Sequence, residues 1–176
     1  MSSEVETSLN ISEFDSIRTL MNDNLTAYLN DHLAGSVAAI ELIDDLVNAL
    51  DNESLKKFLV DLKREIAADQ KSLEQLIANA DEGESVGRKA AAWLSEKAAR
   101  MKFKAAGEDF GGLGLVQALE MLVLGIRGKE SLWRTLQRCG FAPPAGVDLV
   151  ELEQRAVEQE QRVEEKRLEA ARAAFG

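Results

Sequence analysis

The segment DEGESVGRKAAAWLSEKAARMKFKAAGEDFGG, residues 81–112, joins two halves of the chain that each predict a pair of long helices. Glycines near both of its ends interrupt helical periodicity, and the stretch between them has the composition of a shorter helix. Antiparallel neighbours in a bundle usually need connections of only about 2–8 residues. This segment is long enough to cross the full length of a helical bundle, and its length therefore decides the topology.

Two long amphipathic helices are expected on each side of this segment. Apolar residues recur with a 3.6-residue period over about 22–50, 54–80, 113–138 and 148–174. Each of these helices would be roughly 40 Å long at 1.5 Å per residue. The connections within the first and second pairs are short, so each pair is expected to form an antiparallel hairpin.

The last helix has the most specific start signal in the chain. Asp148 and Glu151 have the spacing of a capping box, and Val147 and Leu152 flank them at the spacing of a hydrophobic staple. We therefore expect this helix to begin at Asp148.

The first helix has a polar start signal, because any of the residues 22–24 (Asn-Asp-Asn) can cap it. Residues 1–22 are then expected to form an acidic tail with a short helix, which packs on the body or leads straight into the first long helix. Residues 23–176 are expected to form a single helical-bundle domain with its crossover at about 81–112.

Two antiparallel hairpins joined by one long crossover define an all-α protein whose layout, from about residue 23 to 175, resembles the ferritin-like four-helix-bundle superfamily. Members with a di-iron or di-manganese centre supply one Glu from each of two helices and Glu-x-x-His from each of the other two. This chain has one histidine, His32, and no Glu-x-x-His. The resemblance therefore implies the fold, and the di-metal motifs are missing.

A carboxylate-rich metal site is the alternative. Asp69 continues the apolar stripe of the second helix and Glu160 that of the fourth, while Glu41 and Glu120 each lie one residue from a stripe position. With His32, these residues would form a polar layer near mid-bundle that binds Mn or Fe, or Mg through its oxygen ligands. Buried carboxylates are costly unless they are paired, protonated or metal-bound.

The favoured interpretation of these five residues is structural, and no cofactor is expected. An error of one residue rotates a helical side chain by about 100°, enough to move Asp69 or Glu160 to the edge of the core. For His32, a neutral imidazole bonded to a side chain or a helix carbonyl is the default.

The crossover has the most unusual local composition of the chain, with six basic residues and one acidic residue between Val86 and Ala106. This basic segment would either contact an anionic partner or lie across the acidic bundle. The second arrangement is the favoured interpretation, because the chain is so acidic overall. The candidate partner-binding residues are Arg88, Lys89, Trp93, Lys97, Arg100, Lys102 and Lys104.

The composition excludes several classes of function. The formal charge of −10 disfavours nucleic acid and anionic membranes as main partners. The single cysteine, Cys139, excludes an internal disulfide and a thiolate metal cluster. No stretch of 18 apolar residues is present, and the first eight residues lack a secretory pattern, so a cytoplasmic protein is expected.

The third long helix is apolar beyond one stripe, since Val116, Met121, Val123 and Leu124 extend it. Such a helix is expected to be central in the bundle or to lie at a homodimer contact.

Taken together, the sequence predicts a non-catalytic ferritin-like protein with a binding, scaffolding or stress-related role. The alternatives are a divergent Mn- or Fe-dependent oxidoreductase and an adaptor for an anionic partner.

Overall fold

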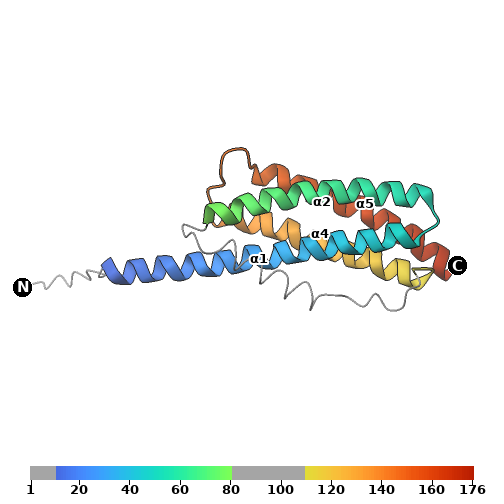
Figure 1. Ribbon diagram of the computed structural model, residues 1–176, viewed down its shortest axis with the longest axis horizontal. Helices are drawn as coiled ribbons and strands as arrows, with labels where there is room; N and C mark the ends of the chain where they lie inside the picture. The colour runs from blue at the N-terminus through green and yellow to red at the C-terminus, as the bar shows by residue number, and fades with distance from the viewer. Residues whose placement is uncertain (1–10, 81–109) are drawn as a thin grey trace, which may run out of the picture.

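The computed structural model describes residues 11–80 and 110–176, with side chains from residue 23 onward. This part of the chain consists of four α-helices and contains no strand (Figure 1). They are α1 (Ile11–Ala49), α2 (Glu53–Ala80), α4 (Leu113–Arg138) and α5 (Leu149–Phe175). The predicted all-α class with four long helices is confirmed.

The helices form two antiparallel hairpins, α1–α2 and α4–α5 (Figure 1). The end of α2 and the start of α4 lie at opposite ends of the bundle, so these two helices run in the same direction. This arrangement agrees with the prediction that residues 81–112 connect the two ends of the bundle. The candidate partner-binding residues, from Arg88 to Lys104, lie outside the described residues.

The first helix is longer than expected. It begins at Ile11, so the predicted start at residues 22–24 is wrong, and residues 11–22 lead straight into the long helix. No glycine or proline occurs between residues 11 and 34, and Asp23 and Asn24 are exposed. Polar residues on a solvent-facing side permit a helix to continue, because capping is a preference and does not by itself end a helix.

The core is one apolar cluster to which all four helices contribute. α4 packs against both α1 and α5, and α1 packs against both α2 and α4. Burial on several sides was predicted for this helix and is confirmed for Val116 and Val123. Met121 and Leu124 are 37% and 55% exposed in the single chain, so for these two residues the expected homodimer contact stays a prediction.

The predicted start of α5 is confirmed. The Asp148 carboxylate accepts hydrogen bonds from the backbone N–H groups of Val150 at 2.8 Å and Glu151 at 3.1 Å. Val147 and Leu152, the predicted staple, are both buried. The cap therefore satisfies two amide groups at the helix N-terminus that have no intrahelical acceptor.

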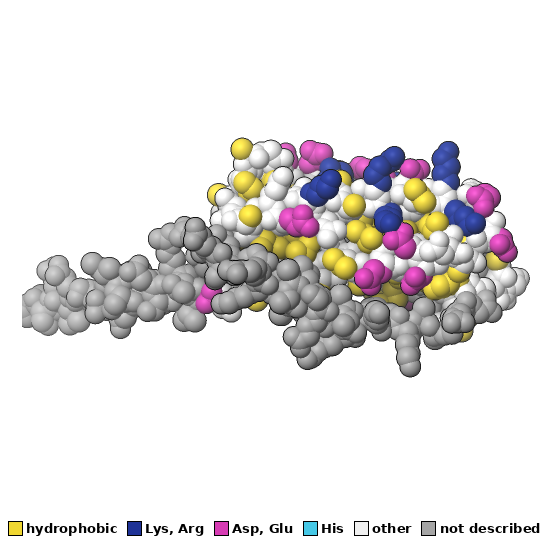
Figure 2. All heavy atoms as spheres, viewed as in Figure 1, with side chains coloured by type: hydrophobic (Ala, Val, Ile, Leu, Met, Phe, Trp, Pro, Cys, Tyr) yellow, Lys and Arg dark blue, Asp and Glu magenta, His cyan; other side chains and the backbone are white. Residues whose placement is uncertain are grey.

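The surface of the described bundle is strongly charged. Figure 2 shows Lys and Arg side chains along one edge of the visible face, mixed with Asp and Glu. Residues 11–80 and 110–176 include no helix that is both long and apolar enough to cross a membrane.

Candidate functional site

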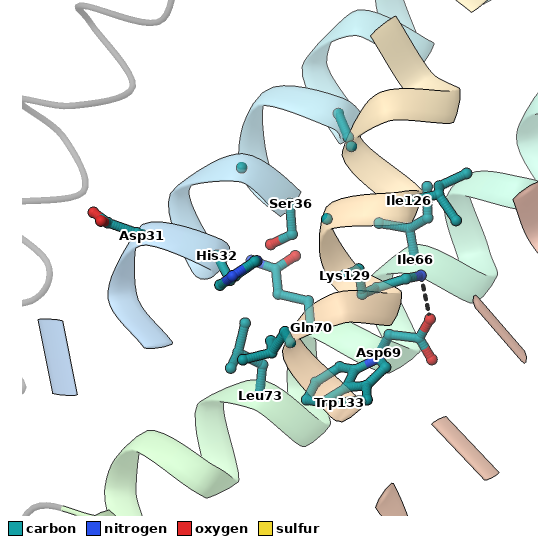
Figure 3. A pocket seen from close by; sticks show the side chains of 15 residues that line it. Asp31, His32, Ser36, Ile66, Asp69, Gln70, Leu73, Ile126, Lys129 and Trp133 are labelled. Carbon is teal, nitrogen blue, oxygen red and sulfur yellow. Dashed lines mark hydrogen bonds and ion pairs between the residues drawn. The ribbon is translucent and has the colours of Figure 1, made fainter. Parts of the chain in front are cut away.

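A cavity of about 210 Å³ lies between α1, α2 and α4 (Figure 3). Apolar side chains, among them Ile66, Leu73 and Leu132, form much of its wall. Polar side chains reach it from all three helices. They are His32 and Ser36 of α1, Asp69 and Gln70 of α2, and Lys129 of α4. An apolar wall with a few polar groups is the usual construction of a small-molecule site.

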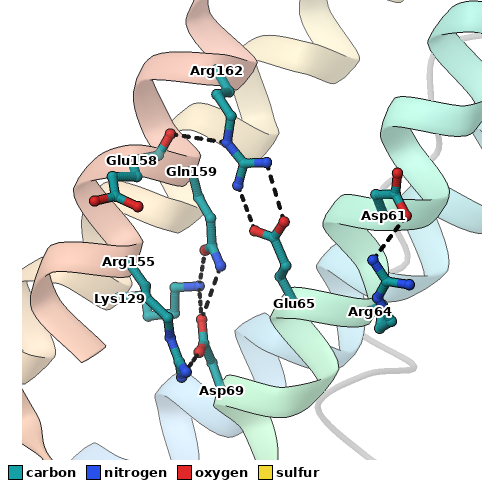
Figure 4. A network of polar contacts seen from close by, with 9 residues as sticks. All are labelled: Asp61, Arg64, Glu65, Asp69, Lys129, Arg155, Glu158, Gln159 and Arg162. Carbon is teal, nitrogen blue, oxygen red and sulfur yellow. Dashed lines mark hydrogen bonds and ion pairs between the residues drawn. The ribbon is translucent and has the colours of Figure 1, made fainter. Parts of the chain in front are cut away.

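Asp69 lies at the centre of a buried charge cluster at one end of this cavity (Figure 4). Its side chain is 1% exposed, and its Oδ2 accepts hydrogen bonds from Lys129 Nζ at 2.6 Å and Gln159 Nε2 at 3.2 Å. Its Oδ1 accepts a hydrogen bond from the guanidinium of Arg155. Gln159, also 1% exposed, accepts a hydrogen bond from Lys129 through its own amide oxygen. The cluster therefore connects α2, α4 and α5.

The electrostatics of the cluster follow from its burial. Removal from water lowers the pKa of Lys129, and the neighbouring Asp69 carboxylate opposes that change. A buried ammonium and a buried carboxylate each lose hydration, and close pairing with further hydrogen bonds offsets the loss. Each member has a hydrogen-bond partner on another helix, so the cluster links the helices through mutually supporting contacts.

A second ion pair lies one helical turn from Asp69. Glu65 of α2 accepts two hydrogen bonds from the guanidinium of Arg162 on α5, one of them at 3.1 Å (Figure 4). Arg155, Gln159 and Arg162 are spaced i, i+4 and i+7, which places them on one face of α5 opposite Asp69 and Glu65. Long polar side chains therefore bridge α2 and α5.

The structure does not bring the five predicted metal ligands together. Asp69 is buried among cations, and Glu160 pairs with Arg127, whose Nε donates to Glu160 Oε1 at 2.9 Å. Glu41 and Glu120 are exposed. Across the part of the chain that the structure describes, no three His, Cys, Asp or Glu side chains are grouped as metal ligands. The predicted mid-bundle layer of these carboxylates is therefore wrong, and only Asp69 and His32 line the cavity.

His32 lies at the α1 side of the cavity and is half-buried. Its ring meets that of Tyr28 edge to face, with 4.7 Å between ring centroids. Burial lowers the pKa of His32, and the charge of Asp31 partly opposes this effect. A pKa below the usual 6.5 favours the neutral form of the imidazole near pH 7.

Sequence reasoning missed Lys129, Arg155 and Gln159. A signal for Gln159 is present, because Leu149, Leu152, Ala156, Gln159 and Val163 follow one another at spacings of three and four residues. All five are buried. Gln159, and not Glu160, therefore continues the apolar stripe of α5.

Two of the polar groups at the cavity form hydrogen bonds with the protein itself. The Ser36 hydroxyl donates a hydrogen bond of 2.7 Å to the backbone oxygen of Leu33. Lys129 is held by two acceptors. A cavity of roughly 150 Å³ accommodates benzene, and by proportion this one accommodates roughly eight to ten non-hydrogen atoms.

Known proteins offer no template for this site. No protein-family model, no curated protein and no solved structure matches the chain.

Proposed function

We propose that this protein is a non-catalytic, ferritin-like helical bundle that binds a small molecule in the cavity between α1, α2 and α4. The parallel course of α2 and α4 between two antiparallel hairpins supports the ferritin-like arrangement (Figure 1). The binding role is supported by the cavity and, above all, by the glycines that line it.

Three glycines in helix interiors line the cavity: Gly35 of α1, and Gly125 and Gly128 of α4. A Cβ atom added at any of them meets no atom of the described residues within 4 Å. None of the three has a positive φ, so none needs glycine for its backbone conformation. Glycine in the middle of a helix costs about 0.5–1 kcal/mol relative to alanine. Stability lost at positions that leave a cavity open is typical of a functional site.

The charge cluster gives this cavity a rigid polar end. Asp69 and Lys129 belong to both, and their positions are set by Gln159 and Arg155 from α5. Binding sites require groups whose own conformations are held by a surrounding layer of hydrogen bonds. The cluster therefore acts as a positioning device, and no chemical step is assigned to it.

The test is to block the cavity with a side chain. Ethylbenzene, with eight non-hydrogen atoms, is the probe, and ligand-observed NMR measures its binding. Wild type and Gly128→Ala are expected to bind it, while Gly128→Leu fills the space and abolishes binding. If Gly128→Leu binds ethylbenzene as well as wild type does, the cavity is not the site and the proposal fails.

Two expectations from the sequence stay predictions. α4 exposes Leu113, Met121 and Leu124, and a homodimer through this face is tested by the molecular mass in solution. Cytoplasmic location agrees with the single, unpaired Cys139.

A further inference from the structure

Gln70 has hydrogen-bonding groups at the cavity that the protein leaves unused. It lines the cavity from α2 and is partly exposed, and its side-chain amide forms no hydrogen bond in the part of the chain that the structure describes. His32 and Ser36 line the cavity from α1 and are also partly exposed. Figure 3 shows the Gln70 amide pointing toward these two side chains. A ligand in the cavity can therefore touch a polar surface made by α1 and α2.

The polar groups at the other end of the cavity are closed to a ligand. Asp69 is 1% exposed and Trp133 is 0% exposed. The ammonium of Lys129 is directed at the Asp69 carboxylate and the Gln159 amide oxygen. The polar groups of a ligand consequently find their partners on the side of Gln70.

The charged side chains at the cavity have partners within the protein. Lys129 pairs with Asp69, and Arg155 pairs with both Asp69 and Glu151. Asp31, which also lines the cavity, has an interaction of its own. An ionic ligand would lose its hydration and would have to compete with these pairs, which favours an uncharged ligand.

The chemistry of a primary amide then selects the ligand's polar edge. The Gln70 side chain presents an acceptor, Oε1, and an N–H donor, Nε2, next to each other in one plane. A ligand that covers this amide with carbon removes its water and leaves both groups unpaired, which is unfavourable. An edge with acceptors alone leaves Oε1 unpaired, and an edge with donors alone leaves the N–H unpaired. The complementary edge carries one donor and one acceptor on adjacent atoms.

Resting on the proposed function, we infer that the ligand is an uncharged molecule of roughly eight to ten non-hydrogen atoms with a cis-amide edge, as in a lactam. Its carbonyl oxygen accepts a hydrogen bond from Gln70 Nε2, and its N–H donates to Gln70 Oε1. The apolar remainder of the ligand occupies the space beside Gly125 and Gly128, against Ile66 and Leu73.

Three probes of one shape test this assignment. Oxindole has the cis-amide edge, 2-indanone has the carbonyl alone, and indane has neither. In ¹⁵N-labelled wild-type protein, the side-chain N–H protons of Gln70 are followed by NMR and are assigned by their loss in Gln70→Met. Oxindole is expected to move one of these protons downfield, as a new hydrogen bond does, whereas indane is not. Equal shifts with both probes would overturn the inference.

A comparison of variants measures the same contact by affinity. Each neutral hydrogen bond corresponds to about a three- to tenfold change in Kd. In Gln70→Met, which removes both bonds and keeps the length of the side chain, the ratio of the Kd values for indane and oxindole is expected to fall about ten- to a hundredfold. The ratio for indane and 2-indanone is expected to fall about three- to tenfold, because one bond is lost.

The matched control is Gln117→Met, which changes an exposed glutamine of α4 that does not line the cavity and should leave both ratios as in wild type. Unchanged ratios in Gln70→Met contradict the inference. Equal falls for oxindole and 2-indanone also contradict it, because the ligand N–H then makes no contact. If Gln70→Met does not fold, the amide shifts in wild-type protein decide.

Failure of this inference is distinguishable from failure of the proposed function. If indane binds and either phenylacetate, an anion, or 2-aminoindane, a cation, binds more tightly than oxindole, the cavity is a binding site and the assigned ligand class is wrong. If none of these probes binds and ethylbenzene does not bind either, both proposals fail. Gly128→Leu serves as the blocked control, in which no probe is expected to move the Gln70 amide signals.

Discussion

Replacing Asp69 by asparagine removes the negative charge from the buried cluster while preserving its shape. The amide keeps one oxygen as an acceptor for Lys129, so the variant creates no cavity and tests the charge itself. The side chain of Lys129 is 13% exposed, so most of it is removed from water. It is left as a buried ammonium whose carboxylate partner is gone.

The size of the effect follows from burial. Removing one partner of a buried ion pair usually costs about 3–5 kcal/mol. Arg155 is 38% exposed and can recover hydration, and Lys129 can lose its proton, so the lower end of that range applies. We expect a loss of about 3 kcal/mol in the free energy of unfolding, which corresponds to a fall in Tm of about 6–12 °C for a chain of this size.

The assay is urea denaturation followed by circular dichroism at pH 7, with Glu65→Gln as the matched control. Glu65 lies one turn before Asp69 on the same helix and also pairs with an arginine of α5, but its side chain is 34% exposed. Pairs of this exposure contribute at most about 1 kcal/mol. Lys129→Met in the Asp69→Asn background is expected to recover part of the loss, because the unpaired ammonium is then gone.

A loss below about 1 kcal/mol in Asp69→Asn, equal to that of Glu65→Gln, would refute the reasoning. It would mean that water reaches Asp69 and that the cluster is not a desolvated network. A changed m-value would signal an altered unfolded or native state and would require the comparison to be made by thermal unfolding as well.

Three further predictions concern stability. Gly125→Ala is expected to raise the free energy of unfolding by about 0.5–1 kcal/mol in urea titrations, since alanine favours the helix and its Cβ meets open space; a destabilised variant would contradict this. Asp148→Ala removes two hydrogen bonds at the start of α5 and is expected to cost about 1 kcal/mol in urea titrations, whereas Asp148→Ser keeps a cap and most of the stability. The folded-state pKa of His32 lies below its usual value of 6.5, so the unfolded chain binds the proton more readily; stability is expected to fall as pH drops below 6.5 and to level off below the folded-state pKa. The difference in unfolding free energy between wild type and His32→Gln should therefore change between pH 7.5 and 5, and a constant difference would show that His32 titrates normally.

Local signals in the sequence determined the helices of this protein. The apolar period predicted α4 at about 113–138, and the capping residues predicted the start of α5, because one-sided burial and caps act within a few residues of the chain. The start of α1 was not predictable in this way. A run of Asn and Asp permits a helix to begin but also permits it to continue, and no glycine or proline decides between the two.

Tertiary structure alone decided what happens at the centre of the bundle. Asp69 was visible as a polar residue in an apolar stripe, yet its partners, Lys129 and Arg155, lie 60 and 86 residues further along the chain. Long flexible side chains on helix flanks reach a buried carboxylate only once helix positions and rotations are set, and periodicity does not contain that information. The cavity, too, is lined by glycines of α1 and α4 that face the same space, a meeting of separate helices that no local pattern records.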